Sequence, residues 1–175
     1  MNPVIKYLET NDIKSLESLG IYARQSTKNP NKWSLNYDMI EAPNGNELVE
    51  HCRGLVISGN PEGSAGQWRV LAWPFRRFYN LGQLHAATLD PLTTWFETKF
   101  DGTLCILYYD DYLGRWCVAT RSVPDADIPN NEGDTFCELF FRNIDPITWF
   151  TITEFHEHNP NLAYDETFLF ELVGP

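Results

Sequence analysis

The chain has 175 residues, of which 43% are hydrophobic and 14% aromatic, so it can bury the core of one compact domain and is not a disordered tail. Its net charge of -11 argues against a general nucleic-acid binder, because such proteins meet phosphates with Lys and Arg. No apolar run reaches the roughly 18 residues of a membrane span, and the N-terminal residues do not resemble a signal peptide, so we expect a cytoplasmic protein without a membrane segment.

The acidic charge is unevenly distributed along the chain. Residues 51–121 hold seven Lys and Arg against six Asp and Glu, whereas residues 122–175 hold one against eleven. The central stretch can therefore face phosphates, and the acidic C-terminal stretch is typical of a solvated face or of a surface for a basic partner. The four cysteines form no C-x-x-C pair, which favours reduced, buried thiols.

The pattern of apolar residues predicts an α+β domain. Residues 3–20 have roughly helical spacing and end at a glycine, and the polar residues 24–33 are expected to form a loop. Strands are expected at 33–37, 55–57, 68–73, 96–99, 104–109, 116–120 and 167–173, with turns at 43–45, 60–66 and 110–114. Helical periodicity covers 136–143 and 147–158.

The sharpest chemical feature is Lys99-Phe100-Asp101-Gly102, a K-x-D-G element expected between two strands. A lysine amine becomes a nucleophile when cationic neighbours, a metal or an apolar pocket favour its neutral form. Gly102 would let backbone and ligand approach closely. Taken alone the element is weak, since Asp-Gly is a common turn pair and an exposed lysine beside a turn explains it equally well.

Further elements accompany this motif along the chain. They are Cys52-Arg53-Gly54, Arg77-Phe78-Tyr79-Asn80-Leu81, Thr120-Arg121-Ser122 and Phe168-Leu169-Phe170-Glu171. With them the chain resembles the bacteriophage-type single-strand ATP-dependent RNA ligases, within the covalent nucleotidyltransferases that include polynucleotide ligases and mRNA capping enzymes. The C-R-G, R-F-Y-N-L, T-K-x-D-G and F-x-F-E elements follow that family's order and approximate spacing, over roughly residues 33–175.

This resemblance implies a fold and an activity. Residues 1–175 would form part of an antiparallel-sheet nucleotidyltransferase (adenylation) domain, an ATP-grasp-like ligase domain. Its enzyme would use ATP and Mg²⁺ to form a lysyl-AMP, transfer the AMP to the 5′-phosphate of an RNA, and seal that end to a 3′-hydroxyl in RNA repair or processing.

The resemblance also assigns roles to individual residues. Lys99 would be the nucleophile, supported by Asp101 and Gly102. The nucleotide-binding residues would be Tyr37, Arg53, Arg77, Thr98, Arg121 and Glu171, and Glu171 would also approach the metal. At position 77 the family often has lysine, so Arg77 differs in shape while keeping the charge.

Each role has an alternative that the sequence leaves open. Arg53 could be a charge at a strand edge, and Tyr37 could be a core residue. Of Arg76 and Arg77, only one can face a pocket if they lie in a strand. The His156-x-His158 pair resembles a metal cluster only superficially, because no third ligand stands at suitable spacing.

Two family features are missing from the chain. A later Glu-Gly strand that helps to bind the metal and a Lys-x-Lys strand that contacts the α-phosphate are not found, so the domain is expected to be truncated at its C-terminal end. Without those lysines, weak or absent adenylylation is expected from this chain alone.

Three other functions stay open at this stage. An mRNA capping guanylyltransferase would use the same lysine with GTP. A non-catalytic nucleotide- or RNA-binding form would bind without a covalent adduct. An α+β domain with an incidental lysine turn would show no effect of nucleotide on stability.

Overall fold

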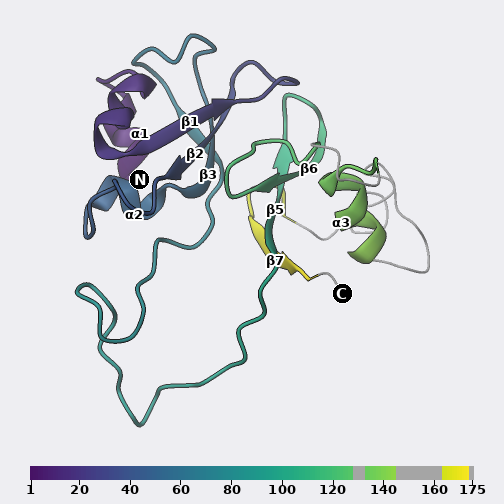
Figure 1. The fold of residues 1–175 in the computed structure, drawn as a ribbon. Helices are drawn as coiled ribbons and strands as arrows, with labels where there is room; N and C mark the ends of the chain where they lie inside the picture. The colour runs from purple at the N-terminus through teal and green to yellow at the C-terminus, as the bar shows by residue number, and fades with distance from the viewer. Residues whose placement is uncertain (128–132, 145–162, 174–175) are drawn as a thin grey trace.

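The computed structural model describes residues 1–127, 133–144 and 163–173, which form an α+β fold with two antiparallel sheets (Figure 1). The first sheet has the strand order β1-β2-β3-β4, and the second has the order β6-β5-β7. The strands are β1 (Ile21–Gln25), β2 (Lys32–Tyr37), β3 (Arg53–Ser58), β4 (Arg69–Ala72), β5 (Thr103–Asp110), β6 (Arg115–Thr120) and β7 (Phe168–Leu172). The helices are α1 (Pro3–Leu8), the 3₁₀ helix η1 (Ile13–Leu19), α2 (Glu47–His51) and α3 (Phe136–Ile144).

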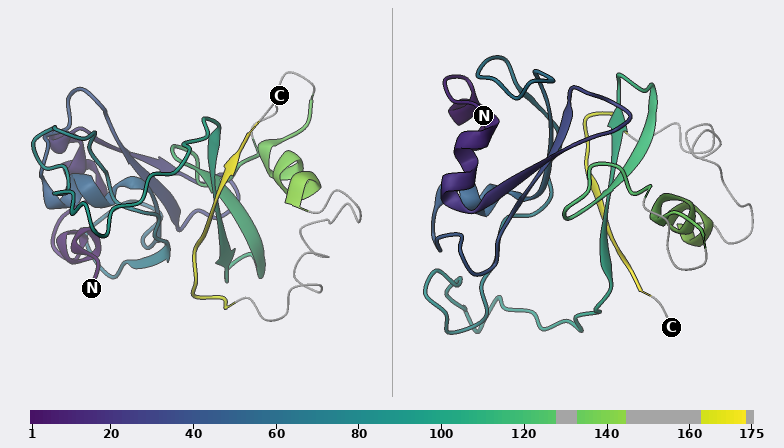
Figure 2. Two further views of the ribbon diagram at one scale, coloured as in Figure 1. Left: turned by 90° about the horizontal axis from the view of Figure 1, so that it is seen from below. Right: turned by 45° about the horizontal axis from the view of Figure 1, so that its top comes forward.

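Strand alternation separates the core into layers, because successive side chains of a strand point to opposite faces. Leu55 of β3 packs into the cluster that contains α1 and α2, whereas the next residue, Val56, packs with Ile106 of β5. Leu107 faces the other way and packs with Phe140 of α3. The two sheets therefore lie face to face, with α1 and α2 outside the first sheet and α3 outside the second (Figures 1 and 2).

Most of the expected elements are confirmed. The helical region at 3–20 is divided into α1 and η1, and Gly20 ends it with a left-handed φ of 67°. The expected strands at 33–37, 55–57, 68–73, 104–109, 116–120 and 167–173 correspond to β2, β3, β4, β5, β6 and β7, and residues 136–143 lie in α3. The predicted helix at 147–158, with His156 and His158, lies outside the described residues.

Two expectations about local structure are wrong, and one helix was not expected. Residues 96–99 are exposed and form no strand, because no neighbouring strand pairs with them. The expected loop at 24–33 begins too early, since Arg24 and Gln25 belong to the short, mostly polar edge strand β1. Helix α2 has only five residues, too few for a periodic signal, although Asn46 caps it by accepting from the backbone N–H groups of Leu48 and Val49.

A long connection, residues 73–102, joins β4 to β5 without helix or strand. Its first part packs against α2, and its later part extends away from both sheets (Figure 1). At its start, the Trp73 backbone N–H donates to Thr167 Oγ1 at 3.0 Å. At its end, a Cβ added to Gly102 would lie 2.3 Å from the carbonyl oxygen of Leu172 in β7. Both ends of the connection are therefore fixed near the second sheet, and only glycine fits at its end.

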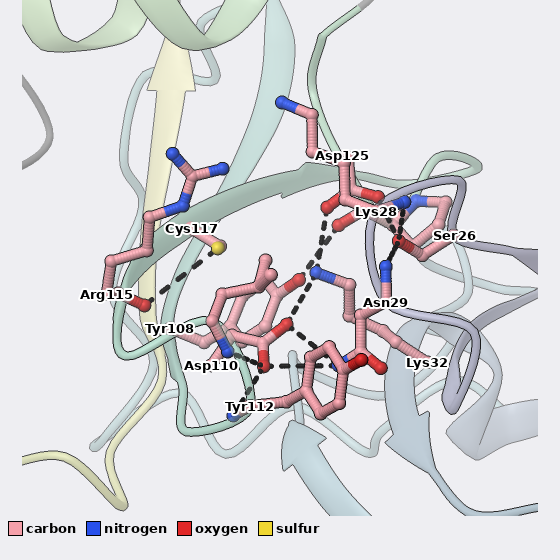
Figure 3. A network of polar contacts seen from close by, with 12 residues as sticks. Ser26, Lys28, Asn29, Lys32, Tyr108, Asp110, Tyr112, Arg115, Cys117 and Asp125 are labelled. Carbon is pink, nitrogen blue, oxygen red and sulfur yellow. Dashed lines mark hydrogen bonds and ion pairs between the residues drawn. The ribbon is translucent and has the colours of Figure 1, made fainter.

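A buried polar network joins the two sheets (Figure 3). The Lys32 ammonium, fully buried at the start of β2, lies 2.7 Å from an oxygen of Asp110 and 2.7 Å from an oxygen of Asp125. Ser26 donates to Asp125, and the Asn29 amide donates to both oxygens of Asp110 at 3.2 Å. We call Lys32, Asp110 and Asp125 the buried triad.

The contacts of the buried triad keep Lys32 protonated despite its burial. Burial alone would lower the pKa of Lys32, but the nearby Cys117 and the hydrogen bonds to Asp110 and Asp125 outweigh it and raise the pKa above its usual value. A buried charge without such partners would be strongly unfavourable. The triad therefore holds Lys32 in its charged form and ties β2 to the second sheet.

Strands β3 and β6 approach closely at Gly54. Its φ of +85° lies in the left-handed region, and an added Cβ would be 2.8 Å from Ile106 Cδ1 and 3.2 Å from Arg121 Cα. Only a residue without a side chain allows this contact between the sheets.

The described cysteines are free and buried, as expected. Burial raises the pKa of Cys105 and Cys117 to about 11 each, so these thiols stay protonated near neutral pH. In the described parts of the chain, no helix has the length and apolar character needed to cross a membrane.

Replacing Lys32 with Met should lower the free energy of unfolding by about 3–5 kcal/mol, because two buried carboxylates lose their cation. Urea denaturation measures this loss. Lys28→Met is the matched control and should cost at most about 1 kcal/mol, since the Lys28–Asp127 pair is partly exposed. A loss of the same size in Lys32→Met and Lys28→Met would contradict this role of the triad.

The raised pKa of Lys32 also predicts a pH dependence. The stabilisation that the Lys32 charge provides is complete below pH 10.5 and is lost as the pH rises through the folded-state pKa of Lys32, so the difference in unfolding free energy between wild type and Lys32→Met should shrink there.

Replacing Gly54 with Ala should destabilise the fold more than the same change at Gly114. Both glycines have positive φ, but no atom lies within 4 Å of a Cβ at Gly114. Gly114→Ala should cost about 1–2 kcal/mol from the backbone conformation, and Gly54→Ala a further 1–3 kcal/mol or so from overpacking. Equal urea midpoints for the two variants would show that the close approach at Gly54 is not tight.

Candidate functional site

Three arginines gather around the C-terminal end of β2, where Tyr37 is 3% exposed. The Arg77 guanidinium carbon lies 4.7 Å from the centre of the Tyr37 ring, and that of Arg121 lies 5.0 Å from it. Arg53, at the start of β3, is electrostatically coupled to Arg121, Tyr37 and Glu171. We call Arg53, Arg77 and Arg121 the arginine cluster.

Arg53 is the least satisfied member of the cluster. Its guanidinium carbon lies 4.5 Å from the Phe75 ring centre and 4.9 Å from that of Phe78, which shield it from water. Its Nη1 atom is buried and has no hydrogen-bond partner among the described residues. Burial and the charge of Arg121 lower the pKa of Arg53, while Tyr37 and Glu171 oppose that shift. A buried cationic N–H group beside a second cation is suited to receive an anion.

Arg121 is held by contacts from the first sheet. Its Nε–H donates to the Asn36 Oδ1 atom at 2.9 Å, and its Nη2 lies 3.1 Å from the sulfur of Met39. The Asn36 amide in turn donates to Ser122 Oγ at 2.9 Å. Asn36 thus fixes the end of β6 against the end of β2 and holds the Arg121 guanidinium beside Tyr37.

Arg77 is held by the segment around α2. Its backbone N–H donates to the Glu50 carbonyl oxygen at 2.8 Å, and its Nη1 donates to the Ala42 carbonyl oxygen at 3.3 Å. The Tyr79 hydroxyl accepts from the Gly45 backbone N–H at 2.9 Å. The R-F-Y-N segment is therefore attached to α2 and to the loop that precedes α2. Arg76 is exposed and Arg77 partly buried, so Arg77 is the member of the pair that faces the cluster, although the two residues do not lie in a strand.

The structure places Lys99 apart from the cluster, in the connection 73–102. The Lys99 ammonium pairs with the Asp101 carboxylate, and these side chains are 73% and 90% exposed. Thr98 is exposed as well. Gly102 lies beside β7, where an added Cβ would be 3.3 Å from Glu171 Cγ. The K-x-D-G element is thus anchored next to Glu171 at its last residue, and its lysine projects into solvent.

The sequence-predicted site residues therefore fall into two groups. Tyr37, Arg53, Arg77 and Arg121 lie together, with Glu171 coupled to Arg53, whereas Thr98, Lys99 and Asp101 are exposed at the far end of the connection that also carries Arg77. Sequence reasoning missed Asn36, Phe75 and Phe78, which hold or cover the arginines. No ligand set for a metal, meaning three or more His, Cys, Asp or Glu side chains together, occurs in the parts that the structure describes.

No family model matches the chain, and comparison with known proteins finds a distant relative. An RNA ligase of Rhodothermus phage RM378 is 25% identical over 157 aligned residues, which cover 71% of this chain and 32% of the relative. The chain thus spans about a third of the length of the relative that it matches. This similarity supports a distant relationship to an RNA ligase.

If the arginine cluster binds polyphosphate, inorganic tripolyphosphate should raise the melting temperature of the chain, because a ligand that binds only the folded state stabilises it. A concentration of 100 times the dissociation constant would add about 2.7 kcal/mol. Arg53→Met should lose most of this shift in differential scanning fluorimetry, and Arg24→Met, at an exposed position of β1, should keep it. Equal shifts in both variants would exclude Arg53 from the binding site.

Proposed function

We propose that the chain is the nucleotide-binding part of an ATP-dependent RNA ligase in which Lys99 becomes adenylylated. The observation that carries the proposal is the gathering of Arg53, Arg77 and Arg121 around Tyr37, with a buried guanidinium N–H that has no partner among the described residues. The distant relationship to a phage RNA ligase supports the same reading.

The cluster is suited to the triphosphate of ATP. Guanidinium groups bind phosphate oxygens bidentately, and three of them can offset the charge that develops on a departing pyrophosphate. Arg77 and Arg121 flank Tyr37 and would contact different phosphates, while the Arg53 Nη1 atom would gain the anionic partner that it lacks.

Magnesium would be held mainly by the phosphates and by water, as is usual for Mg²⁺ with nucleotides. Glu171 is the predicted carboxylate for it. The ion would supply charge neutralisation at the phosphates.

In the first step the neutral Lys99 amine attacks the α-phosphorus of ATP. A P–N bond forms, the bond between the α-phosphorus and the bridging oxygen breaks, pyrophosphate leaves, and the amine releases a proton. Lys99 must first leave Asp101 and approach the arginine cluster, a movement that residues 99–101 make from the fixed position of Gly102.

The later steps act on RNA. An oxygen of the RNA 5′-phosphate attacks the phosphorus of the lysyl-AMP, which frees Lys99. A 3′-hydroxyl then attacks the activated 5′-phosphate, and AMP leaves as the phosphodiester bond forms. RNA with these two ends is therefore the proposed substrate.

Intact-mass spectrometry of the purified chain after incubation with ATP and Mg²⁺ tests the first step. We expect at most a small fraction of the chain to gain one AMP, because the Lys-x-Lys strand is not found in it. This adduct should be absent from Lys99→Ala, which lacks the nucleophile, and retained in Lys14→Ala, whose lysine is exposed in η1. Incubation with GTP should give no adduct, whereas an adduct with GTP in place of ATP would indicate capping chemistry.

An adduct retained in Lys99→Ala would overturn the assignment of the nucleophile. A wild-type chain that gains no mass while tripolyphosphate still stabilises it would indicate nucleotide binding without catalysis.

A further inference from the structure

A cavity of about 500 Å³ opens on the outer side of Arg77. Its walls combine apolar surface, carboxamide side chains and one guanidinium, mainly from Met39, Asn44, Arg77, Phe78, Asn80 and Gln83. The proposed mechanism uses only Arg77 of these residues. A volume of a few hundred Å³ with apolar walls and a few polar groups is typical of a small-ligand site.

We infer that this cavity binds one nucleotide of a single-stranded RNA, with its base against Phe78 and its phosphate toward Arg77. The inference rests on the proposed function and deepens it by naming where the RNA strand contacts this chain.

The aromatic wall of the cavity favours a base. Phe78 is 59% exposed, so its ring is open to solvent. On the side of the arginine cluster it contacts Phe75 and Arg53. An exposed ring next to a cation is the usual arrangement for stacking unpaired bases.

The polar wall favours the edge of a base. Asn44, Asn80 and Gln83 each carry a carboxamide, which offers both a donor and an acceptor to a base edge. The Gln83 Oε1 atom accepts from the Asn80 backbone N–H at 2.8 Å, which fixes the position of this side chain in the wall.

The open rim of the cavity favours an RNA strand over a free nucleotide as its ligand. Ile40 is 93% exposed and Leu84 is 80% exposed, so the cavity is open at its edge and a chain of nucleotides can enter and leave it. Met39 lines the cavity and also contacts Arg121, so the cavity adjoins the proposed polyphosphate site without replacing it.

The experiment measures binding of a fluorescently labelled, 5′-phosphorylated RNA decamer to the chain by fluorescence anisotropy. Phe78→Ala should weaken binding roughly 5- to 100-fold because one stacked base is lost, and Phe78→Trp should restore it. Tyr112→Ala is the matched control, since Tyr112 is also 59% exposed but lies outside the cavity, and it should bind as wild type does. Asn44→Leu should weaken binding and change the preference among homopolymer decamers.

Lysyl-AMP formation is followed in the same variants, since the first step needs no RNA. Weakened RNA binding with an unchanged AMP adduct in Asn44→Leu, which lines the cavity and lies outside the arginine cluster, supports the inference. RNA binding that depends on Phe78 in a chain that forms no adduct supports the cavity while the proposed adenylylation fails. Unchanged RNA binding in Phe78→Ala, no binding by wild type, or full competition by ATP alone would each overturn the inference.

Discussion

The buried triad is the interaction on which the relative placement of the two sheets depends. Lys32 starts β2, and Asp110 ends β5, so the ion pairs fix one end of the sheet interface. Asn36 and Arg121 join the opposite end, where β2 and β6 finish. The cost of removing three charges from water is offset only when all the partners are present. The two sheets are therefore favoured in the arrangement that brings Lys32 to both carboxylates. The arginine cluster can form because the sheets meet at both ends.

The fold was largely predictable where side chains alternate or repeat over several residues. The strands around Leu55 and Leu107 and the helix around Phe140 bury one face each, and that periodicity is visible in the sequence. β1 and α2 are short and largely polar, so pairing with β2 decides the structure of β1, and the Asn46 cap helps to decide that of α2. The strand expected at 96–99 had suitable residues but no partner strand, and a strand does not persist without one.

The candidate site was predictable only through motif order. Arg53, Arg77 and Arg121 were named from the resemblance, and the structure brings them together around Tyr37. Nothing in the local sequence marks Asn36 as the residue that holds Arg121, or Lys32 as part of a buried ion pair, because both depend on contacts about 80 residues apart in the chain. Long-range polar contacts leave no periodic signal, and for that reason sequence reasoning missed them.

Gly102 gives the lysine of the K-x-D-G element a short tether. Its contact with the Leu172 carbonyl fixes the chain beside β7, and two residues separate it from Lys99, which is three steps along the backbone. Three extended residues reach roughly 10 Å, so the Lys99 backbone is confined to a small volume around that point. Its amine is therefore presented to any ligand near Glu171 at an effective concentration on the order of millimolar or above, set by tether length and not by packing. Lengthening the chain between Lys99 and Gly102 would lower the effective concentration of this amine without altering a single contact in the core.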